Sequence, residues 1–278
     1  MNKFCDLHTH STFSDGTLTP TEIIDAATHI GLSAVALCDH NTVDGLPEFL
    51  AAAKSKPVEA ITGAEFSVDY DGTELHLLAL YIPEKHFGQI SQLMVSVNHR
   101  KERSNIELVN SLNKAGYLID YDTIKSGSPN AKINRAHIAA ELTRKGYTSS
   151  VKEAFDTLLA PEKGFYREPR RVTFWEMLDV IKAIAAVPVL AHPFLNLSEE
   201  ELANFLPKAK AAGLVGMECL YSSYDSYETE KSLELAATFK LAKSGGSDFH
   251  GDTKPDIKLG LGKGNLAIPY TWAVDLKR

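Results

Sequence analysis

The sequence of 278 residues has only three cysteines, Cys5, Cys38 and Cys219, and it has no Cys-x-x-Cys pair. An odd number of widely spaced cysteines argues against a disulfide framework and a thiolate zinc site, and predicts buried thiols in a reducing compartment. No apolar run approaches the ~20 residues that a membrane span needs. The first residues also lack the apolar stretch of a secretory signal peptide. We therefore expect a cytoplasmic protein.

Basic residues are also fewer than acidic residues in this sequence. The chain has 29 lysines and arginines against 36 acidic residues, and its net charge is -7. Proteins bind duplex DNA mainly through its phosphates, so this balance argues against a duplex DNA partner. It is compatible with a small anion in a local cationic pocket. With 44% hydrophobic and 23% charged residues, the chain can bury a full core.

The sequence alternates between segments typical of strands and segments typical of helices. Short apolar segments near residues 5, 36, 61, 78, 189, 217 and 242 predict seven strands. Capping boxes at Thr19 with Glu22 and at Thr173 with Glu176 predict the starts of two of the intervening helices. Polar residues recur where the strand-like segments end, as they do in α/β barrels. We therefore predict an α/β fold with a closed barrel.

The pattern changes in the middle of the chain. A long helix is expected over about residues 87–116, residues 120–134 are polar and rich in turn formers, and two short helices are expected near 137–145 and 151–159. We therefore assign residues 1–99 and 171–278 to the barrel, and residues 100–170 to a small helical insertion.

Two local patterns bring ligand-type side chains together. In an extended segment His8 and His10 point to the same side, because successive side chains alternate between faces. Asp71-Gly72 predicts a two-residue hairpin turn, whose register places Glu65 and His76 on one face as diagonal neighbours. A shift of one residue in the register would put them on opposite faces.

Nine residues at or near the predicted strand ends have side chains that bind metals. They are His8, His10, Asp15, His40, Glu65, His76, His192, Asp248 and His250. A barrel core would not bury so many unpaired polar groups, because each one costs free energy. Nitrogen and oxygen ligands without any cysteine suit two or three divalent ions such as Mn, Fe or Zn.

Seven motifs follow one another along the chain. They are Asp6-Leu7-His8-Thr9-His10, Ser14-Asp15-Gly16, Cys38-Asp39-His40, Gly63-Ala64-Glu65, His76-Leu77-Leu78, Ala191-His192-Pro193 and Gly246-Ser247-Asp248-Phe249-His250. Together they resemble the successive motifs of the polymerase and histidinol phosphatase (PHP) family. The one departure is Cys38, where the family commonly has threonine. The resemblance implies a distorted (β/α)7 barrel, similar to a TIM barrel, with a metal site.

The resemblance also implies roles for these residues. A first ion would be held by His8, His10, Glu65 and Asp248, a second by Glu65, His76 and His192, and a third by Asp15, His40 and His250. Asp6 and Asp39 would orient ligand imidazoles. A hydroxide that bridges two ions would attack a phosphate ester, so the implied activity is metal-dependent hydrolysis.

The stand-alone PHP phosphoesterases grip the substrate phosphate with an Arg-x-His segment and a Lys-Gly-x-Tyr segment. The matching residues here are Arg135, His137, Lys163 and Tyr166. His137 is also a candidate for the acid that protonates the leaving group. These relatives act on nucleoside 3′,5′-bisphosphates and on short RNA from its 5′ end, so we expect a nucleotide phosphatase or exonuclease. The alternatives are a histidinol-phosphate phosphatase and a non-catalytic module that binds metal or nucleotide.

Overall fold

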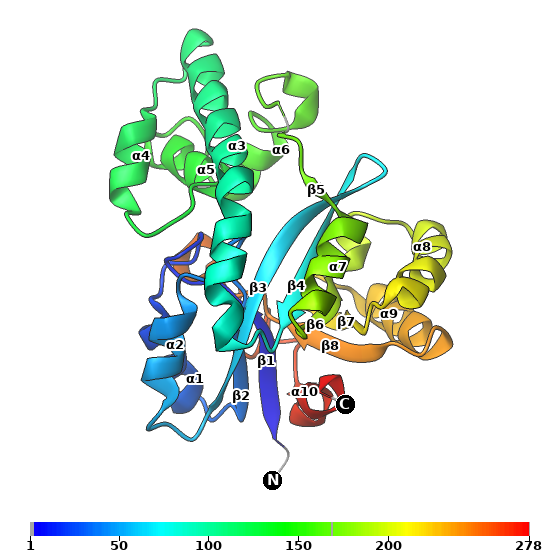
Figure 1. Ribbon diagram of the computed structural model, residues 1–278. Coiled ribbons are helices and arrows are strands. Elements are labelled where there is room, and N and C mark those ends of the chain that lie inside the picture. Colours follow the sequence, from blue (N-terminus) through cyan, green and yellow to red (C-terminus); the bar gives the residue numbers. More distant parts are fainter. Residues whose placement is uncertain (1–2, 168, 278) are drawn as a thin grey trace.

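A computed structural model of the chain describes residues 3–167 and 169–277. Within these residues, seven strands form a barrel-like sheet (Figure 1). They are β1 (Phe4–Thr9), β2 (Ala34–Leu37), β3 (Glu59–Tyr70), β4 (Thr73–Leu80), β6 (Val187–Ala191), β7 (Gly216–Tyr221) and β8 (Ala242–Gly246). Their order is β8-β7-β6-β4-β3-β2-β1. The barrel closes just beyond β8, where the Asp248 amide donates to the His8 carbonyl at 2.9 Å and the His10 amide donates to the Phe249 carbonyl at 2.9 Å. The predicted α/β barrel fold is confirmed.

The hairpin between β3 and β4 has the predicted register. Ser67 pairs with His76 and Glu65 pairs with Leu78 across an antiparallel ladder. Asp71 and Gly72 both have positive φ, 50° and 88°, as a two-residue turn of this kind requires. Both faces of the barrel wall are apolar. On β2, Val35 packs with the helix-facing residues, whereas Ala36 belongs to a second cluster with residues from β1, β3 and β4.

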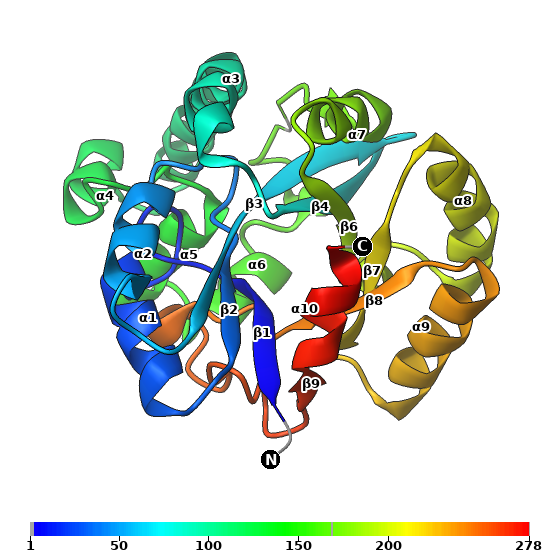
Figure 2. The same cartoon turned by 60° about the horizontal axis from the view of Figure 1, so that its bottom comes forward.

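Helices surround the barrel, as Figure 2 shows with α1 and α2 on one side and α8 and α9 on the other. The surrounding helices are α1 (Pro20–His29), α2 (Leu46–Ala53), α7 (Phe174–Ala183), α8 (Glu199–Ala212), α9 (Ser226–Thr238) and α10 (Tyr270–Leu276). The predicted capping boxes begin α1 and α7, because Thr19 and Thr173 each accept a hydrogen bond from the backbone of the glutamate three residues later. The short strand β5 (Val172–Thr173) pairs with β3 in parallel, and the short strand β9 (Ile268–Pro269) pairs with β1 in the antiparallel direction.

The helices in the middle of the chain lie over the end of the barrel that is opposite the N-terminus (Figure 1). They are α3 (Phe87–Lys114), α4 (Tyr121–Gly127), α5 (Arg135–Arg144) and α6 (Val151–Asp156). The first half of α3 packs on the barrel through Ile90 and Met94. Its second half contributes Leu108 and Leu112 to a separate apolar cluster with α4, α5 and α6. The helices in the middle of the chain thus have an apolar cluster of their own, and the insertion over residues 100–170 stays a prediction.

The sequence-based interpretation of residues 120–134 as turns was wrong for half of this segment. It contains α4, which begins where the Asp120 carboxylate accepts a hydrogen bond from the Thr123 amide at 2.8 Å. Only Ile124 of this helix is buried, so the segment has no apolar periodicity to reveal it. Among the described residues, no helix is both long and apolar enough to span a membrane.

Candidate metal centre

The side chains of the nine candidate ligands converge in one cluster, which Glu65 and His76 reach from within β3 and β4. His8 lies in β1, Glu65 in β3 and His76 in β4. His192 directly follows β6, and Asp248 lies shortly after the end of β8. His192 and Asp248 both have positive φ, 27° and 56°, a conformation that disfavours a residue with a Cβ. Strained backbone of this kind gathers at functional sites, and here it turns two ligand side chains toward the barrel axis.

The carboxylate of Glu65 lies at the centre of this cluster. Its Oε1 is 2.7 Å from His76 Nδ1 and 3.0 Å from His192 Nε2. Its Oε2 is 3.0 Å from His40 Nδ1 and 3.2 Å from both His8 Nε2 and His10 Nε2. The predicted register of the hairpin therefore placed Glu65 and His76 correctly. One carboxylate that faces five imidazoles can bridge two cations.

The remaining candidates lie beside His10. Asp248 Oδ1 is 3.2 Å from His10 Nε2 and 3.4 Å from His250 Nδ1. Asp15 Oδ1 is 3.3 Å from His250 Nε2, and Asp15 Oδ2 is 3.7 Å from His40 Nε2. All nine residues predicted as ligands thus belong to one connected cluster.

Three groups within this cluster have ligand atoms close enough to hold a metal ion, all within 4.8 Å of one another. They are His10 with Asp15, His40 and His250; His8 with His10 and Glu65; and His40 with Glu65 and His76. Because His10, His40 and Glu65 each occur in two groups, the groups are adjacent. The arrangement suits a cluster of ions better than separate sites.

The buried polar atoms of the cluster fit cations. Among the described residues, Asp15 Oδ1, Glu65 Oε2, His40 Nδ1 and His192 Nδ1 are buried without a hydrogen-bond partner. Unpaired buried polar atoms are costly, and metal ions would satisfy those of Asp15, Glu65 and His40. These three residues belong to the groups that could hold an ion.

The carboxylates of the cluster are ionised at neutral pH. Burial would raise the pKa of Glu65, but the imidazoles of His76, His8 and His40 outweigh burial and hold that pKa well below its ordinary value. Burial likewise opposes ionisation of Asp248, and Lys254 and His250 hold its pKa well below the ordinary value. The site therefore presents anionic ligands to a cation.

Glu218 of β7 was missed as a site residue, although its position near a strand end was visible in the sequence. Its Oε1 is 3.1 Å from His8 Nδ1, and its Oε2 accepts a hydrogen bond from the His192 amide at 2.8 Å. One carboxylate thus orients the imidazole of one ligand and the backbone of another.

Asp6 and Asp39 were expected to orient imidazoles, and the structure gives them different contacts. Asp6 accepts hydrogen bonds from the Ser247 amide at 2.9 Å and from the Gly260 amide at 2.8 Å, so it holds two loops together. Asp39 accepts from the Ser14 hydroxyl at 2.5 Å, and that hydroxyl lies 3.4 Å from His10 Nδ1. Within the described residues, the hydrogen bonds of Asp39 reach the His10 imidazole through Ser14.

A cleft of about 230 Å³ opens from this cluster toward the insertion. Its walls include the candidate ligands Asp15, His40 and His76, the cations Lys101, Arg135, Arg170 and Arg171, and the rings of Phe155 and Tyr166. We call it the metal cleft. Glu74 Oε2 accepts from Arg135 Nη2 at 3.3 Å and from Arg171 Nη2 at 2.7 Å, and the Arg135 guanidinium lies 4.5 Å from the centre of the Tyr166 ring. The cleft can bind an anion beside the cluster.

Only two of the four residues predicted to grip phosphate line the metal cleft. Arg135 and Tyr166 lie in its wall, whereas Lys163 is exposed and is not among its described lining residues. His137 instead caps its own helix, with Nδ1 2.9 Å from Asn134 Oδ1. Sequence reasoning had no signal for Asn134, whose amide donates to Asp15 Oδ2 at 2.8 Å and links the insertion to the cluster.

Comparison with known proteins agrees with this geometry. Residues 6–170 match the PHP domain family. The chain is 32% identical to a 5′-3′ exoribonuclease of Haemophilus influenzae, covering 90% of this chain and 91% of that protein. It is 30% identical to a 3′,5′-nucleoside bisphosphate phosphatase of Chromobacterium violaceum, covering 88% and 86%.

Among solved structures, the fold is similar to that of a protein from Bifidobacterium adolescentis described as a metal-dependent phosphoesterase. The TM-score is 0.87 at 26% sequence identity, covering 99% of this chain and 95% of that one. Near full-length similarity to a phosphatase and an exoribonuclease makes this chain a phosphoester hydrolase. The family match over more than half of its residues, together with these relatives, shows that the chain belongs to the PHP family.

Proposed function

We propose that this chain hydrolyses phosphate esters of nucleotides, either nucleoside 3′,5′-bisphosphates or short 5′-phosphorylated oligoribonucleotides. The observation that carries the proposal is the metal cleft, in which arginines and aromatic rings stand next to the ligand cluster. An anion that is bound there lies against His40 and His76. The activities in the names of the two relatives support the same substrate class.

The nine ligands are proposed to hold two or three divalent ions, of Mn, Fe or Zn. One ion would lie among His8, His10, Glu65 and Asp248, a second among Glu65, His76 and His192, and a third among Asp15, His40 and His250. The short distances from Glu65 to His76 and His192 and from Asp15 to His250 support this division. When bound, such ions activate water and neutralise charge on a phosphate.

The protein side chains would bind and orient the substrate. Arg135 and Arg171 offer guanidinium donors that suit phosphate oxygens, and Lys101 adds a third positive charge from α3. Glu74 keeps both guanidinium groups together at the mouth of the cluster. Tyr166 and Phe155 offer rings on which a base can stack. Lys163 and His137 stay proposed phosphate contacts that would require movement of their side chains.

Glu218→Gln tests whether the Glu218 carboxylate orients the candidate ligands His8 and His192. The variant keeps the shape of the side chain but loses the charge that orients His8, so the affinity for the activating metal is expected to fall by about 10- to 100-fold. Titrating activity with Mn and measuring bound metal would detect the change. Glu228→Gln, in the exposed N-terminal capping box of α9, is the matched control and should titrate like the parent protein.

The proposed substrate class is tested by phosphate release. Purified protein with added Mn is expected to release phosphate from 3′-phosphoadenosine 5′-phosphate, or mononucleotides from a short 5′-phosphorylated oligoribonucleotide. Histidinol phosphate at the same concentration is the comparison substrate and should turn over far more slowly. If neither nucleotide substrate were hydrolysed, or if histidinol phosphate were preferred, the proposal would be wrong.

We also propose the cytoplasm as the compartment. Cys5, Cys38 and Cys219 are all buried as free thiols. Buried unpaired thiols are typical of proteins kept in a reducing environment. Localisation of a tagged chain by fractionation would test this.

A further inference from the structure

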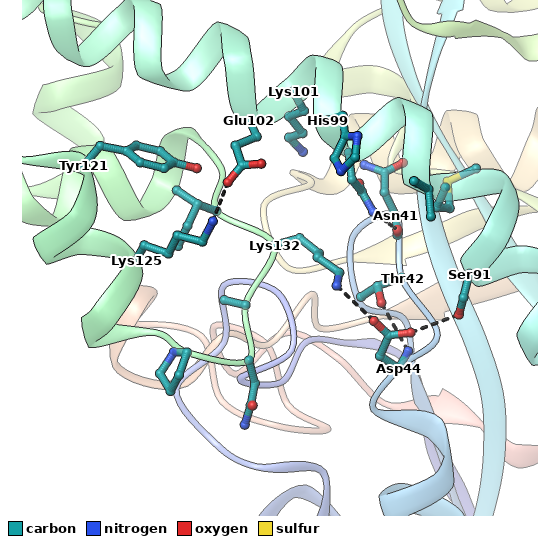
Figure 3. Close-up of a pocket in the computed structure, with 17 residues that line it drawn as sticks. Asn41, Thr42, Asp44, Ser91, His99, Lys101, Glu102, Tyr121, Lys125 and Lys132 are labelled. Carbon is teal, nitrogen blue, oxygen red and sulfur yellow. Dashed lines mark hydrogen bonds and ion pairs between the residues drawn. The ribbon is translucent and has the colours of Figure 1, made fainter.

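A second and larger cavity lies beside the metal cleft. Its volume is about 400 Å³, and its walls come from α3, α4, the segment 41–44 and the segment 129–133 (Figure 3). Asn41 and Lys101 line both this cavity and the metal cleft. The two spaces are therefore neighbours along one surface that begins at the ligand cluster. We call the second cavity the lysine pocket.

Three lysines from different elements line the lysine pocket. They are Lys101 of α3, Lys125 of α4 and Lys132, and two carboxylates face them (Figure 3). Lys132 Nζ is 3.0 Å from Asp44 Oδ2, and Lys125 Nζ is 2.5 Å from Glu102 Oε1. The side chains of both pairs are between 36% and 55% exposed. Ion pairs this exposed contribute little, so a phosphate can replace either carboxylate.

Lys101 differs from the other two lysines. Within residues 3–167 and 169–277 it forms no ion pair within 4.0 Å. Because Lys101 lines both the metal cleft and the lysine pocket, it can bind an anion in either one. A negatively charged chain running from the metal cleft into the lysine pocket would pass this side chain.

Two further side chains in the lysine pocket suit a nucleotide. The half-buried ring of Tyr121 lies in its wall and can stack on a base. Asn98 Oδ1 is buried without a hydrogen-bond partner, while its amide nitrogen donates to the Asn41 carbonyl at 3.2 Å. This unpaired acceptor can accept a hydrogen bond from a ligand donor, such as a ribose hydroxyl or a base amine.

We propose that the lysine pocket binds the next nucleotide of a single-stranded oligoribonucleotide whose terminal nucleotide occupies the metal cleft. The proposal rests on the proposed function, and it favours oligonucleotides over single nucleotide bisphosphates as substrates. A cavity of this volume is within the range that holds small ligands. Lysines for the phosphate, a ring for the base and an unpaired acceptor are the contacts that single-stranded RNA uses.

The test is equilibrium binding in the presence of a chelator, so that nothing is hydrolysed. Unlabelled 5′-phosphorylated RNAs of one to four nucleotides compete with a fluorescent tetranucleotide for the full-length protein. The dinucleotide is expected to bind at least about tenfold more tightly than the mononucleotide, because it adds one stacked base and one phosphate contact. Equal affinity at all lengths would overturn the proposal.

Variants of the three lysines test which side chains provide the additional affinity for the longer RNA. Lys125→Met and Lys132→Met are each expected to weaken tetranucleotide binding about threefold to tenfold and to lower its salt slope by about 0.7 per lost phosphate contact. Binding of a nucleoside 3′,5′-bisphosphate should not change. Lys101→Met should weaken both ligands. Lys208→Met, on the exposed surface of α8, is the matched control and should change neither.

Two results separate this proposal from the proposed function. If Lys125→Met and Lys132→Met weaken the bisphosphate as much as the tetranucleotide, the pocket serves the first nucleotide or a free anion, and the proposal is wrong. If length-dependent binding is seen but neither substrate is hydrolysed with Mn, the proposed function fails while the RNA-binding pocket stands.

Discussion

Replacement of Glu65 by glutamine is expected to lower phosphoester hydrolysis by more than about 100-fold. This exceeds the usual effect of changing a residue that only orients a metal ligand. Glu65 is the residue that contacts the largest number of candidate ligands, with five imidazoles within 3.2 Å of its two oxygens. Glutamine keeps the shape but removes the negative charge, and it places an NH2 group against nitrogens that must face a cation. Two ion positions should therefore be weakened at once.

The measurement for Glu65→Gln includes a readout that does not depend on activity. Ions that bind only the folded protein raise its unfolding midpoint, and a concentration of 100 times Kd stabilises by about 2.7 kcal/mol. We expect Mn to raise the midpoint of the parent protein and to leave that of the variant almost unchanged. Metal content after gel filtration should fall in parallel.

Glu59→Gln is the matched control for this experiment. It makes the same substitution in the same strand, but Glu59 lies at the other end of β3, where its carboxylate accepts from the Tyr270 hydroxyl at 2.7 Å and pairs with Lys277. This variant should keep the activity and the metal response of the parent. Parent-like activity and metal content in Glu65→Gln would contradict the proposed role of Glu65 as a bridging ligand.

The part of this site that the sequence predicted depends on local geometry. The two-residue turn at Asp71-Gly72 fixes the register of the hairpin, and the register alone brings Glu65 to His76. The spacing of His8 and His10 likewise follows from the alternation of side chains in a strand. Such distances are set within a few residues of the chain, so no knowledge of the rest of the fold is needed.

The contacts that the sequence did not predict join segments that are far apart. Glu218 reaches His8 across 210 residues, and Asn134 reaches Asp15 across 119. Both contacts depend on how the barrel closes and how the insertion lies on it, which no periodicity encodes. In the sequence Lys101 belongs to a run of charged residues at 100–103, a pattern typical of a helix surface. Only the packing of α3 on the barrel turns Lys101 toward the cleft.

The same reasoning explains why the structure brings the predicted metal ligands together more completely than the predicted phosphate-binding residues. Most candidate ligands lie in or just after a strand end, and the hairpin of β3 and β4 places Glu65 and His76. Lys163 is the last residue of a short 3-10 helix, and Tyr166 lies in the loop that follows it. A spacing of three residues across this boundary does not fix the direction of a side chain. Of this pair, Tyr166 lines the metal cleft and Lys163 is exposed.

The second large effect is expected from removing both arginines of the metal cleft. Hydrogen bonds to charged groups contribute about 1.5–3 kcal/mol each, so Arg135→Met with Arg171→Met should lower kcat/KM for a nucleotide substrate by about 10²- to 10⁴-fold. Both guanidinium groups pair with Glu74, which is not a candidate metal ligand, so the metal content should stay at the parent level. Steady-state kinetics with metal analysis would separate loss of substrate binding from loss of metal.

Two controls accompany the double arginine variant. One tests the loss of positive charge alone, and the other tests repulsion of the substrate by Glu74. Arg144→Met removes an arginine from the same helix as Arg135, but its side chain is 65% exposed and pairs with Glu141, so activity should be unchanged. Without the two arginines, the Glu74 carboxylate would stay beside His76 Nε2, 3.6 Å away, and could repel a phosphate. Adding Glu74→Gln removes that charge. If the triple variant regained parental kcat/KM, repulsion by Glu74 and not loss of the arginines would explain the defect, and the role of the arginines in phosphate binding would be rejected.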